Sequence, residues 1–374
     1  RASLLTGCYQ QRFGKVFDGP LDGRSDRDTG LPLDAVTIAE ILKGKGYATA
    51  CFGKWHLGYR PPWLPPSQGF DEFRGLVSGD GDHYTHVDRS GNEDWWHNNA
   101  LEMERGYTTE LLTQHAIRFM EGHVDTPFFI YLAHLAIHFP WQGPQDPPHR
   151  HPGTDYYEDK WGVIGNPDDV SPHIKGMVES LDSSVGAVVA ALERLHLDKN
   201  TLIIFASDNG GYLHYGEKFK NISSNGPLRD QKGAVYEGGH RVPAIFYWPG
   251  RIQPSVTKQT VMTMDLLPTL ARIAGAETAS LLLDGMDIGP LLFQDATLPT
   301  RTFFWRIDES WAVREGPWKL CGEGIKCELY NLDDDLGEQH DRAAEQPERV
   351  KAMREAWKTW EEDVNKSAAA YAKP

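Results

Sequence analysis

Apolar residues recur along the chain first at helical spacing and then in short unbroken runs. Each helical stretch leads into a run of strand length, and this order occurs three times. The predicted helix and strand pairs are residues 36–42 with 49–52, residues 112–120 with 128–132, and residues 177–195 with 202–205. Such repeats predict an α/β fold with a large, mostly parallel sheet sandwiched between helices.

The pattern changes beyond about residue 297. Four strand-like pieces, residues 302–305, 311–314, 318–321 and 327–330, precede an amphipathic helix over residues 347–364. These pieces predict a small antiparallel sheet with a helix. We therefore expect a large domain over residues 1–297 and a C-terminal α+β subdomain over residues 298–374.

Two irregular stretches, residues 59–100 and 139–172, are rich in Pro, Gly, Asp, His and Trp. Both are too long to be simple connectors between elements. Since long loops on a rigid scaffold commonly carry function, we expect them to shape a binding cleft.

Composition and charge narrow the function classes. The chain has 374 residues, of which 40% are hydrophobic and 24% are charged, as in an ordinary soluble globular protein. The net charge of -15 argues against nucleic-acid binding, because a phosphate backbone is bound through dense clusters of Lys and Arg. No apolar run approaches the roughly 20 residues needed to span a membrane. An anionic substrate would have to meet local positive charge.

The four cysteines bear on the compartment. Cys321 and Cys327 flank a stretch with two glycines, so we expect them to face each other across a hairpin. A disulfide there is one interpretation, and reduced cysteines that merely pack are the other. The cysteine count and the many tryptophans fit an exported protein, periplasmic or secreted, or lysosomal in a eukaryote. Residues 1–7 show no signal-peptide pattern.

Polar side chains follow each of the three predicted strands. Lys54 and His56 come after the first, His138 after the second, and Asp208 and Asn209 after the third. If the strands run parallel, these groups converge at one edge of the sheet, where ligands of open α/β folds bind. A Lys beside a His at such an edge suits an anion, although a surface loop is the other interpretation.

Three of these positions have plain structural alternatives. Asp208 and Asn209 supply oxygen donors that suit Ca²⁺ or Mg²⁺, but Asp-Asn-Gly is also a common turn. Lys232 lies beside Gly233, where the backbone can approach a ligand closely, or it is a solvated surface lysine. His138, two residues before Pro140, is either a functional group or a hydrogen-bonded structural one.

Together these segments resemble the formylglycine-dependent sulfatases of the alkaline phosphatase superfamily, over nearly the whole chain. Residues 1–7 are similar to the second half of the sulfatase signature, and residues 46–58, with Gly53-Lys54-Trp55-His56-Leu57-Gly58, are similar to the second signature. Ser207-Asp208-Asn209-Gly210 and Lys232-Gly233 with Glu237-Gly238-Gly239 follow in the family's order. A chance match of all these motifs in sequence is very improbable.

The resemblance implies a role for each matching residue. Arg1 and Lys54 would stabilise the hydrated formylglycine and its sulfated form, and His56 would act on the hydrate's hydroxyl when sulfate is expelled. Lys232 and His138 would contact the sulfate and the bridging oxygen, with His138 as the general acid. The metal ligands among the residues present would be Asp208 and Asn209, and the metal would be Ca²⁺.

The chain also departs from the family pattern. The Cys or Ser that becomes formylglycine would precede Arg1, and so would the first strand with its pair of metal-binding aspartates. Cys8 follows Arg1 and is expected to be packed or disulfide-bonded rather than the nucleophile. We therefore expect a chain starting at Arg1 to be inactive, to bind metal poorly, and to be a fragment or a record that begins after a modified residue.

The long loops would set the substrate. Aromatic and hydrogen-bonding side chains suit a sugar ring, and the residues assigned to it are Asp82, His83, Trp141 and His240. Trp95 and Trp96 are equally expected to anchor their loop to the core. The predicted function is a sulfuric ester hydrolase acting on a sulfated polysaccharide, oligosaccharide or glycosaminoglycan. A phosphodiester or phosphonate hydrolase of the same superfamily and a non-catalytic binder of sulfated glycans are the alternatives.

Overall fold

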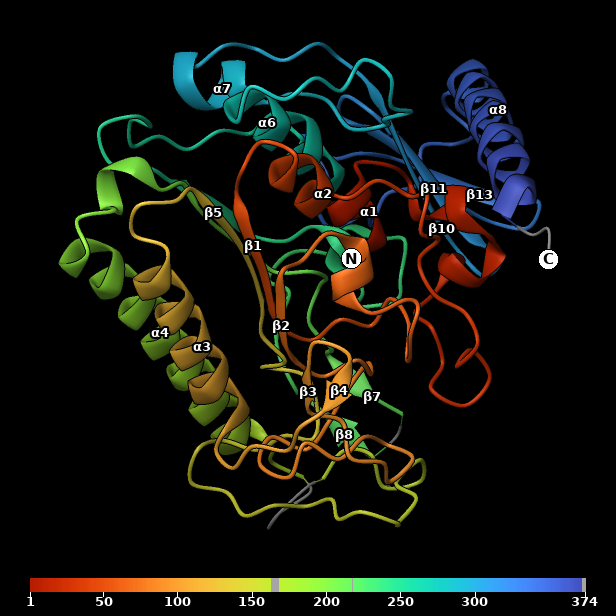
Figure 1. Ribbon diagram of the computed structural model, residues 1–374. Coiled ribbons are helices and arrows are strands. Elements are labelled where there is room, and N and C mark those ends of the chain that lie inside the picture. Colours follow the sequence, from red (N-terminus) through yellow and green to blue (C-terminus); the bar gives the residue numbers. More distant parts are fainter. Residues whose placement is uncertain (163–167, 217, 372–374) are drawn as a thin grey trace. The chain divides into compact units, whose positions relative to one another are not determined.

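The computed structural model describes residues 1–162, 168–216 and 218–371, which form two compact units (Figure 1). The first unit contains residues 1–9, 20–202 and 248–294, and the second contains residues 10–19, 203–247 and 295–374. The domain boundary predicted after residue 297 remains a prediction.

The first unit is built on a mixed five-stranded sheet. Its strands are β1 (Ala48–Gly53), β2 (Glu72–Gly75), β3 (Trp96–His97), β4 (Ala100–Leu101) and β5 (Phe128–Ala133), hydrogen-bonded in the order β4-β3-β2-β1-β5. β1 is parallel to both β2 and β5, whereas β3 and β4 add an antiparallel edge. The helices are α1 (Ala2–Thr6), α2 (Ile38–Lys43), α3 (Thr108–Gly122), α4 (Ser171–Arg194), α6 (Leu266–Ile273) and α7 (Gly289–Gln294), with 3-10 turns at Pro65–Gln68, Asp198–Asn200 and Thr263–Asp265.

Helices cover both faces of this sheet. Phe52 of β1 and its neighbours pack against Leu112 and Phe119 of α3 in one apolar cluster, and α4 packs on the outside of α3 (Figure 1). Phe129, which points to the other face of β5, packs with Leu42 of α2 and Leu267 of α6. Successive apolar side chains of a strand point to opposite faces of the sheet, so both faces need a cover of helices. The structure confirms the predicted helix–sheet–helix layers.

Helix α2 shows how local sequence sets an element's limits. The Thr37 hydroxyl accepts a hydrogen bond from the Glu40 backbone amide at 3.2 Å, and the Glu40 carboxylate accepts one from the Thr37 backbone amide at 2.8 Å. This reciprocal cap satisfies two donors that a helix start would otherwise leave unpaired. The helix ends at Lys43, next to Gly44, within one residue of the predicted end at residue 42.

The third predicted strand has a different partner from the one expected. β6 (Ile203–Ala206) belongs to the second unit and pairs antiparallel with β9 (Ala244–Tyr247), with Ile204 opposite Phe246. The apolar run at residues 202–205 predicts a strand correctly, but such a run carries no information about the strand's neighbour or direction. Among the described residues, the parallel pairs are those of β1 with β2 and β5.

The rest of the second unit is dominated by an antiparallel meander and the terminal helix. The meander is β10 (Thr302–Ile307), β11 (Ser310–Glu315), β12 (Trp318–Glu323) and β13 (Lys326–Asn331), and α8 (Pro347–Tyr371) packs on it. The rings of Trp311 and Trp357 stack at 5.1 Å, as do those of Phe304 and Trp360. The unit also holds β7 (His214–Tyr215), β8 (Phe219–Lys220), α5 (Glu237–His240) and 3-10 turns at Gln10–Phe13 and Lys15–Asp18. The predicted small sheet with a helix is confirmed, although the helix extends past residue 364.

Of the two interpretations of Cys321 and Cys327, the hairpin disulfide is wrong and the reduced cysteines are confirmed. Cys327 lies opposite Gly322, and Cys321 lies opposite Glu328, so the two thiols point to opposite faces of the sheet. Both thiols are free. Cys8 is packed, as expected, and its thiol donates to the Leu282 carbonyl at 2.9 Å. No helix within the described ranges is both long and apolar enough to cross a membrane.

Candidate active site

The end of β1 carries a buried lysine. Gly53 has a φ of +114°, and a Cβ added there would lie 2.1 Å from the Ala133 carbonyl oxygen of β5, so only glycine fits. The next amide, that of Lys54, donates to the same carbonyl at 2.8 Å. Lys54 directly follows β1 at the carboxyl end of the strand and is only 6% exposed.

Arg1 lies against the residue that follows β1. Its Nη1 donates to the Lys54 carbonyl at 2.7 Å and to the Tyr131 hydroxyl of β5 at 2.9 Å. The structure therefore brings Arg1 and Lys54, which are 53 positions apart in the chain, to one edge of the sheet. Two cationic residues therefore lie at this edge, and their contact with an anionic substrate remains a prediction.

His56 is held as a neutral imidazole. Its Nε2 lies 2.8 Å from the Leu21 carbonyl oxygen, and its ring fills the space that a side chain at Gly79 would need. Because a carbonyl can only accept, Nε2 carries the proton and Nδ1 keeps its lone pair. Burial, and then the charge of Lys54, hold the pKa of His56 well below its usual range. This histidine is therefore a base rather than a cation at neutral pH.

His138 shares a buried carboxylate with His56. Its Nδ1 donates to the Phe139 carbonyl at 2.8 Å, which leaves Nε2 as the basic nitrogen. Asp80 interacts electrostatically with both histidines and accepts hydrogen bonds from Arg89 and Arg150 at 2.9 and 3.0 Å. Burial alone would raise the pKa of Asp80, but these two arginines hold it below its ordinary value. Asp80 is therefore a fixed negative charge beside the candidate acid.

The residues predicted to bind sugar in the first unit are buried within the two long loops. Asp82 is fully buried. Its carboxylate accepts hydrogen bonds from the backbone amides of Thr85 and Arg150 at 2.8 Å, and it accepts three more from other donors. His83 is also fully buried, and Trp141 is 2% exposed. These side chains tie residues 59–100 to residues 139–172, so direct contact with a substrate remains a prediction.

Trp95 belongs to the core of the first unit, where it is fully buried. Trp96 is half-buried and donates from Nε1 to Asp94 at 2.8 Å. Both therefore anchor their loop, which was one of the two interpretations of this tryptophan pair.

In the second unit, the predicted metal ligands and Lys232 lie on adjoining turns. The Asn209 side-chain amide donates to Asp208 Oδ1 at 2.7 Å. The backbone amide of Lys232 donates a hydrogen bond to the Gly211 carbonyl at 3.3 Å. The side-chain Nζ of Lys232 lies 5.3 Å from the centre of the Tyr212 ring. The structure thus brings these three predicted residues onto one small surface of this unit.

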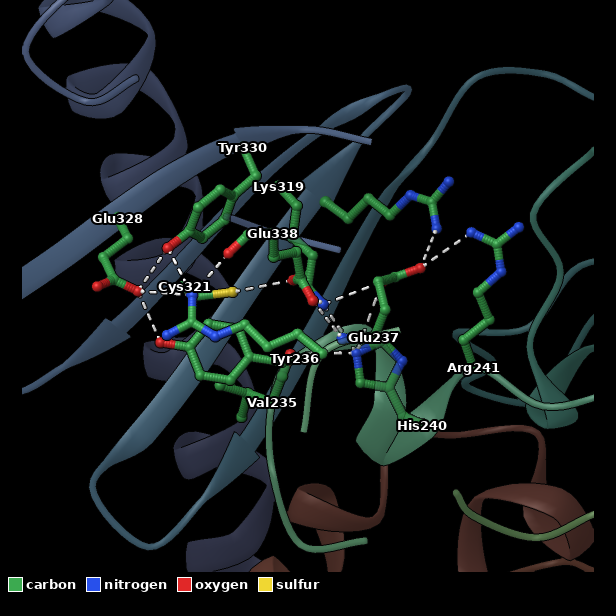
Figure 2. A network of polar contacts seen from close by, with 12 residues as sticks. Val235, Tyr236, Glu237, His240, Arg241, Lys319, Cys321, Glu328, Tyr330 and Glu338 are labelled. Atoms are coloured by element: carbon green, nitrogen blue, oxygen red, sulfur yellow. Dashed lines mark hydrogen bonds and ion pairs between the residues drawn. The ribbon is translucent and has the colours of Figure 1, made fainter. Parts of the chain in front are cut away.

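His240 lies in a network of charged side chains of the second unit, shown in Figure 2. Its ring stacks on Trp305 at 4.2 Å, and its Nε2 lies 3.2 Å from Lys319 Nζ. Burial, and then the Lys319 charge, lower the pKa of His240 to about 3, so the ring is neutral. A contact of His240 with substrate remains a prediction.

A cavity of about 500 Å³ lies elsewhere in the first unit, between α3, β2 and the segment after β4. Arg74, His115 and Arg118 are among the residues that line it, and none of the predicted site residues does. It therefore does not contribute to the candidate site.

Comparison with known proteins decides the family. The profile described as Sulfatase matches residues 1–276, well over half of the chain. This chain belongs to the sulfatase family.

Two curated relatives and one solved structure show how far this likeness extends. The sulfatase chain is 33% identical to arylsulfatase A of Bos taurus over 356 residues, and 31% identical to N-acetylgalactosamine-6-sulfatase of Rattus norvegicus over 343 residues. Each match covers 85% of this chain, but only 64% and 61% of those relatives' own length. The crystal structure titled Ps i-CgsB in complex with k-i-k-neocarrahexaose superimposes with a TM-score of 0.76 at 28% identity, covering 96% of this chain and 80% of that one.

Calcium and formylglycine are general to the sulfatase family. Ca²⁺ takes six to eight oxygen ligands. Asp208 and Asn209 are hydrogen-bonded to each other, and the described ranges contain no group of three or more His, Cys, Asp or Glu that could hold a metal ion. The residues that the structure describes therefore do not form a calcium site by themselves.

Sequence reasoning missed two sets of buried charges. Asp80 was given no role, although it interacts electrostatically with both candidate histidines, and Lys319 was not singled out. Lys319 occupies a fully buried position in the otherwise apolar stretch of residues 318–321. A lysine within such a run is the signal that would have pointed to a buried carboxylate partner.

Proposed function

We propose that this sulfatase-family protein hydrolyses the sulfuric esters of a sulfated carbohydrate. The observation that carries the proposal is the grouping of Arg1, Lys54 and neutral His56 at the carboxyl end of β1. The sulfated-sugar class is supported by the name of the N-acetylgalactosamine-6-sulfatase relative and by the neocarrahexaose complex of the similar crystal structure. An exported location accords with such a substrate.

The two cations would act on the transferred group. A sulfuryl group in transfer spreads negative charge over its oxygens, and fixed cations in a buried site stabilise that charge without having to reorganise. The Arg1 guanidinium is held by its hydrogen bonds to the Lys54 carbonyl and the Tyr131 hydroxyl, and Lys54 is held through its backbone amide. In the family, formylglycine supplies the nucleophile when it is present.

The two histidines would divide the proton transfers. His56 has its lone pair on Nδ1, and its lowered pKa keeps it unprotonated at neutral pH, so this nitrogen is free to accept a proton as sulfate is expelled. His138 is bonded through Nδ1 to a carbonyl, so Nε2 would deliver the proton to the departing alcohol. The fixed negative charge of Asp80 favours the protonated form of His138.

The remaining assignments rest on the resemblance. Lys232 would contact the sulfate, and Asp208 and Asn209 would be two of the oxygen ligands of calcium. Asp82, His83, Trp141 and His240 would act on substrate choice, the first three by fixing the conformation of the long loops in which they are buried.

The direct test is a desulfation screen. The protein would be produced from its whole gene together with a formylglycine-generating enzyme, and inorganic sulfate would be measured after incubation with sulfated monosaccharides and oligosaccharides. A phosphodiester, bis(4-nitrophenyl) phosphate, serves as the control substrate. Sulfate release from at least one sulfated sugar, faster than phosphodiester cleavage, is expected. Preference for the phosphodiester, or glycan binding without release, would overturn the proposal.

The role of His138 can be tested by its leaving-group dependence. His138→Ala should lower turnover of a sulfated sugar by about 10² or more, because a sugar alkoxide leaves poorly without a proton. Turnover of 4-nitrophenyl sulfate should fall far less, because nitrophenolate needs no protonation. Equal losses on the two substrates would argue against His138 as the acid.

A further inference from the structure

A buried group of three charges joins the C-terminal sheet to the turn at α5. Lys319 of β12 is fully buried, and its Nζ lies 2.9 Å from both Glu237 Oε1 and Glu338 Oε1 (Figure 2). The backbone amide of Glu237 also donates to Glu338 Oε2 at 2.7 Å. We call Glu237, Lys319 and Glu338 the Lys319 clamp, because together they hold both the side chain and the backbone at the start of α5.

The charges of this clamp are balanced locally. The second oxygen of Glu237 lies 3.2 Å from Arg241 and 3.3 Å from Arg314. Burial would raise the pKa of Glu237, but Lys319 and the other cations lower it to about 2, so it is ionised at neutral pH. A buried ion pair is a weak source of stability, since its desolvation cost offsets much of its attraction. Its more specific effect is to fix geometry.

The fixed geometry reaches the candidate site residues of this unit directly. The Gly210 amide donates to the Gly239 carbonyl at 3.0 Å, and a Cβ on Gly210 would lie 1.7 Å from the Gly238 carbonyl oxygen. The Asp208–Asn209 turn therefore rests on α5 with no side chain between them. The Lys232 amide donates in turn to the Gly211 carbonyl. Any shift of α5 must move this turn.

We propose that Lys319 is a positioning residue for sulfate-ester hydrolysis: through Glu237 and the backbone of α5, it sets the placement of Asp208, Asn209 and Lys232. The inference rests on the proposed function, in which Lys232 contacts the sulfate. Lys319 itself is fully buried and is bonded to carboxylates, so it acts through these residues and not on the substrate. Displacement of reacting groups by about 1 Å can cost on the order of 10² in rate.

The experiment compares three variants of the whole protein. Lys319→Met leaves two carboxylates without their shared cation and risks misfolding. The double variant Lys319→Met/Glu338→Gln removes the bridge while balancing the charge, because Glu237 keeps Arg241 and Arg314. Lys326→Met changes an exposed lysine of the neighbouring strand β13 and is the matched control.

Amide hydrogen exchange measures the coupling without any need for turnover. In the double variant, the Gly210 and Gly238 amides should exchange at least about tenfold faster, while β1 in the first unit exchanges as before. On a sulfate ester, kcat should fall about 10- to 100-fold, with KM changed by less than about threefold, because transition-state contacts are displaced. The Lys326→Met control should match the unsubstituted protein in both measurements.

The outcomes separate the two proposals. Unchanged exchange or unchanged kcat in a folded double variant would overturn the positioning role alone. Absence of sulfate release by the unsubstituted protein would overturn the proposed function and, with it, the catalytic half of this inference.

Discussion

His134 has a hydrogen-bond partner on only one side of its ring. Its Nε2 lies 3.0 Å from the Ser184 hydroxyl of α4, which in turn lies 2.6 Å from the Thr113 hydroxyl of α3. Within the described part of the chain, its buried Nδ1 has no hydrogen-bond partner. Burial lowers the pKa of His134 to about 4, so the ring is neutral, and Ser184 is its one link to the α3–α4 pair.

Removing that link should cost stability. Ser184→Ala would leave both ring nitrogens of His134 without a partner in the interior, which we expect to lower the free energy of unfolding by about 1–3 kcal/mol. Ser183→Ala, at the exposed neighbouring position, should change it by less than about 0.5 kcal/mol. Urea denaturation of both variants measures the difference. Equal, small effects would mean that the buried hydroxyl contributes nothing.

At the scale of single residues, the sequence predicted identities better than contacts. Lys54, His56 and Arg1 were selected because motifs and strand ends mark them, and the structure brings Arg1 and Lys54 together. The roles of Asp80 and of the Lys319 clamp were missed, because pairs such as Asp80 with Arg150 and Lys319 with Glu237, which are 70 and 82 positions apart, leave no local pattern. Side-chain burial of Asp82 and His83 was missed for the same reason.

Among the elements, two glycines should respond to alanine in opposite ways. Gly186 lies exposed within α4, with open space at its Cβ, so Gly186→Ala should raise the free energy of unfolding by about 0.5–1 kcal/mol. Gly53→Ala should lower it by at least about 2 kcal/mol, because its φ is +114° and its Cβ would meet the Ala133 carbonyl. Thermal and urea unfolding of the two variants test both signs, and stabilisation by Gly53→Ala would contradict the described end of β1.

Elements with strong periodicity were predicted well. The stripe over residues 177–195 became α4 (Ser171–Arg194), and the run at residues 128–132 became β5 (Phe128–Ala133). What the sequence could not provide was pairing: β6 was expected beside the parallel strands and pairs instead with β9. The hairpin register that separates Cys321 from Cys327 was also beyond reach, because a shift of one residue reverses the face of each side chain.

Considered over the whole molecule, buried histidines should make stability depend on pH. The pKa values of His83, His86 and His134 are each lowered to about 4, chiefly by burial, whereas an unfolded histidine titrates near 6.5. Between these values the unfolded chain binds more protons, so stability is lost as pH falls below 6.5, by about 1.4 kcal/mol per pH unit for each histidine. Asp94 has the opposite effect. Burial raises its pKa to about 7, so below that pH the folded chain holds one proton that the unfolded chain releases, and this offsets the loss from one histidine.

The net expectation is a rise in stability from pH 4.5 to pH 6.5. Urea midpoints at pH 4.5, 5.5 and 6.5 measure it, since a midpoint shift at constant slope reports stability. Replacing Asp94 by Asn should steepen the rise, because the opposing carboxyl is then gone. A flat or falling profile over this range would show that the histidines are not buried in neutral form.

The central claim is that fixed cations at the end of β1 serve sulfate-ester hydrolysis, and Lys54→Met tests it most directly. The protein produced from its whole gene with a formylglycine-generating enzyme is assayed for sulfate release from 4-nitrophenyl sulfate. Lys258→Met, at an exposed position of the first unit, is the control and should stay within about twofold of the unsubstituted protein. We predict that kcat/KM of a folded Lys54→Met variant falls by at least about 10². Turnover equal to that of the control would contradict the account.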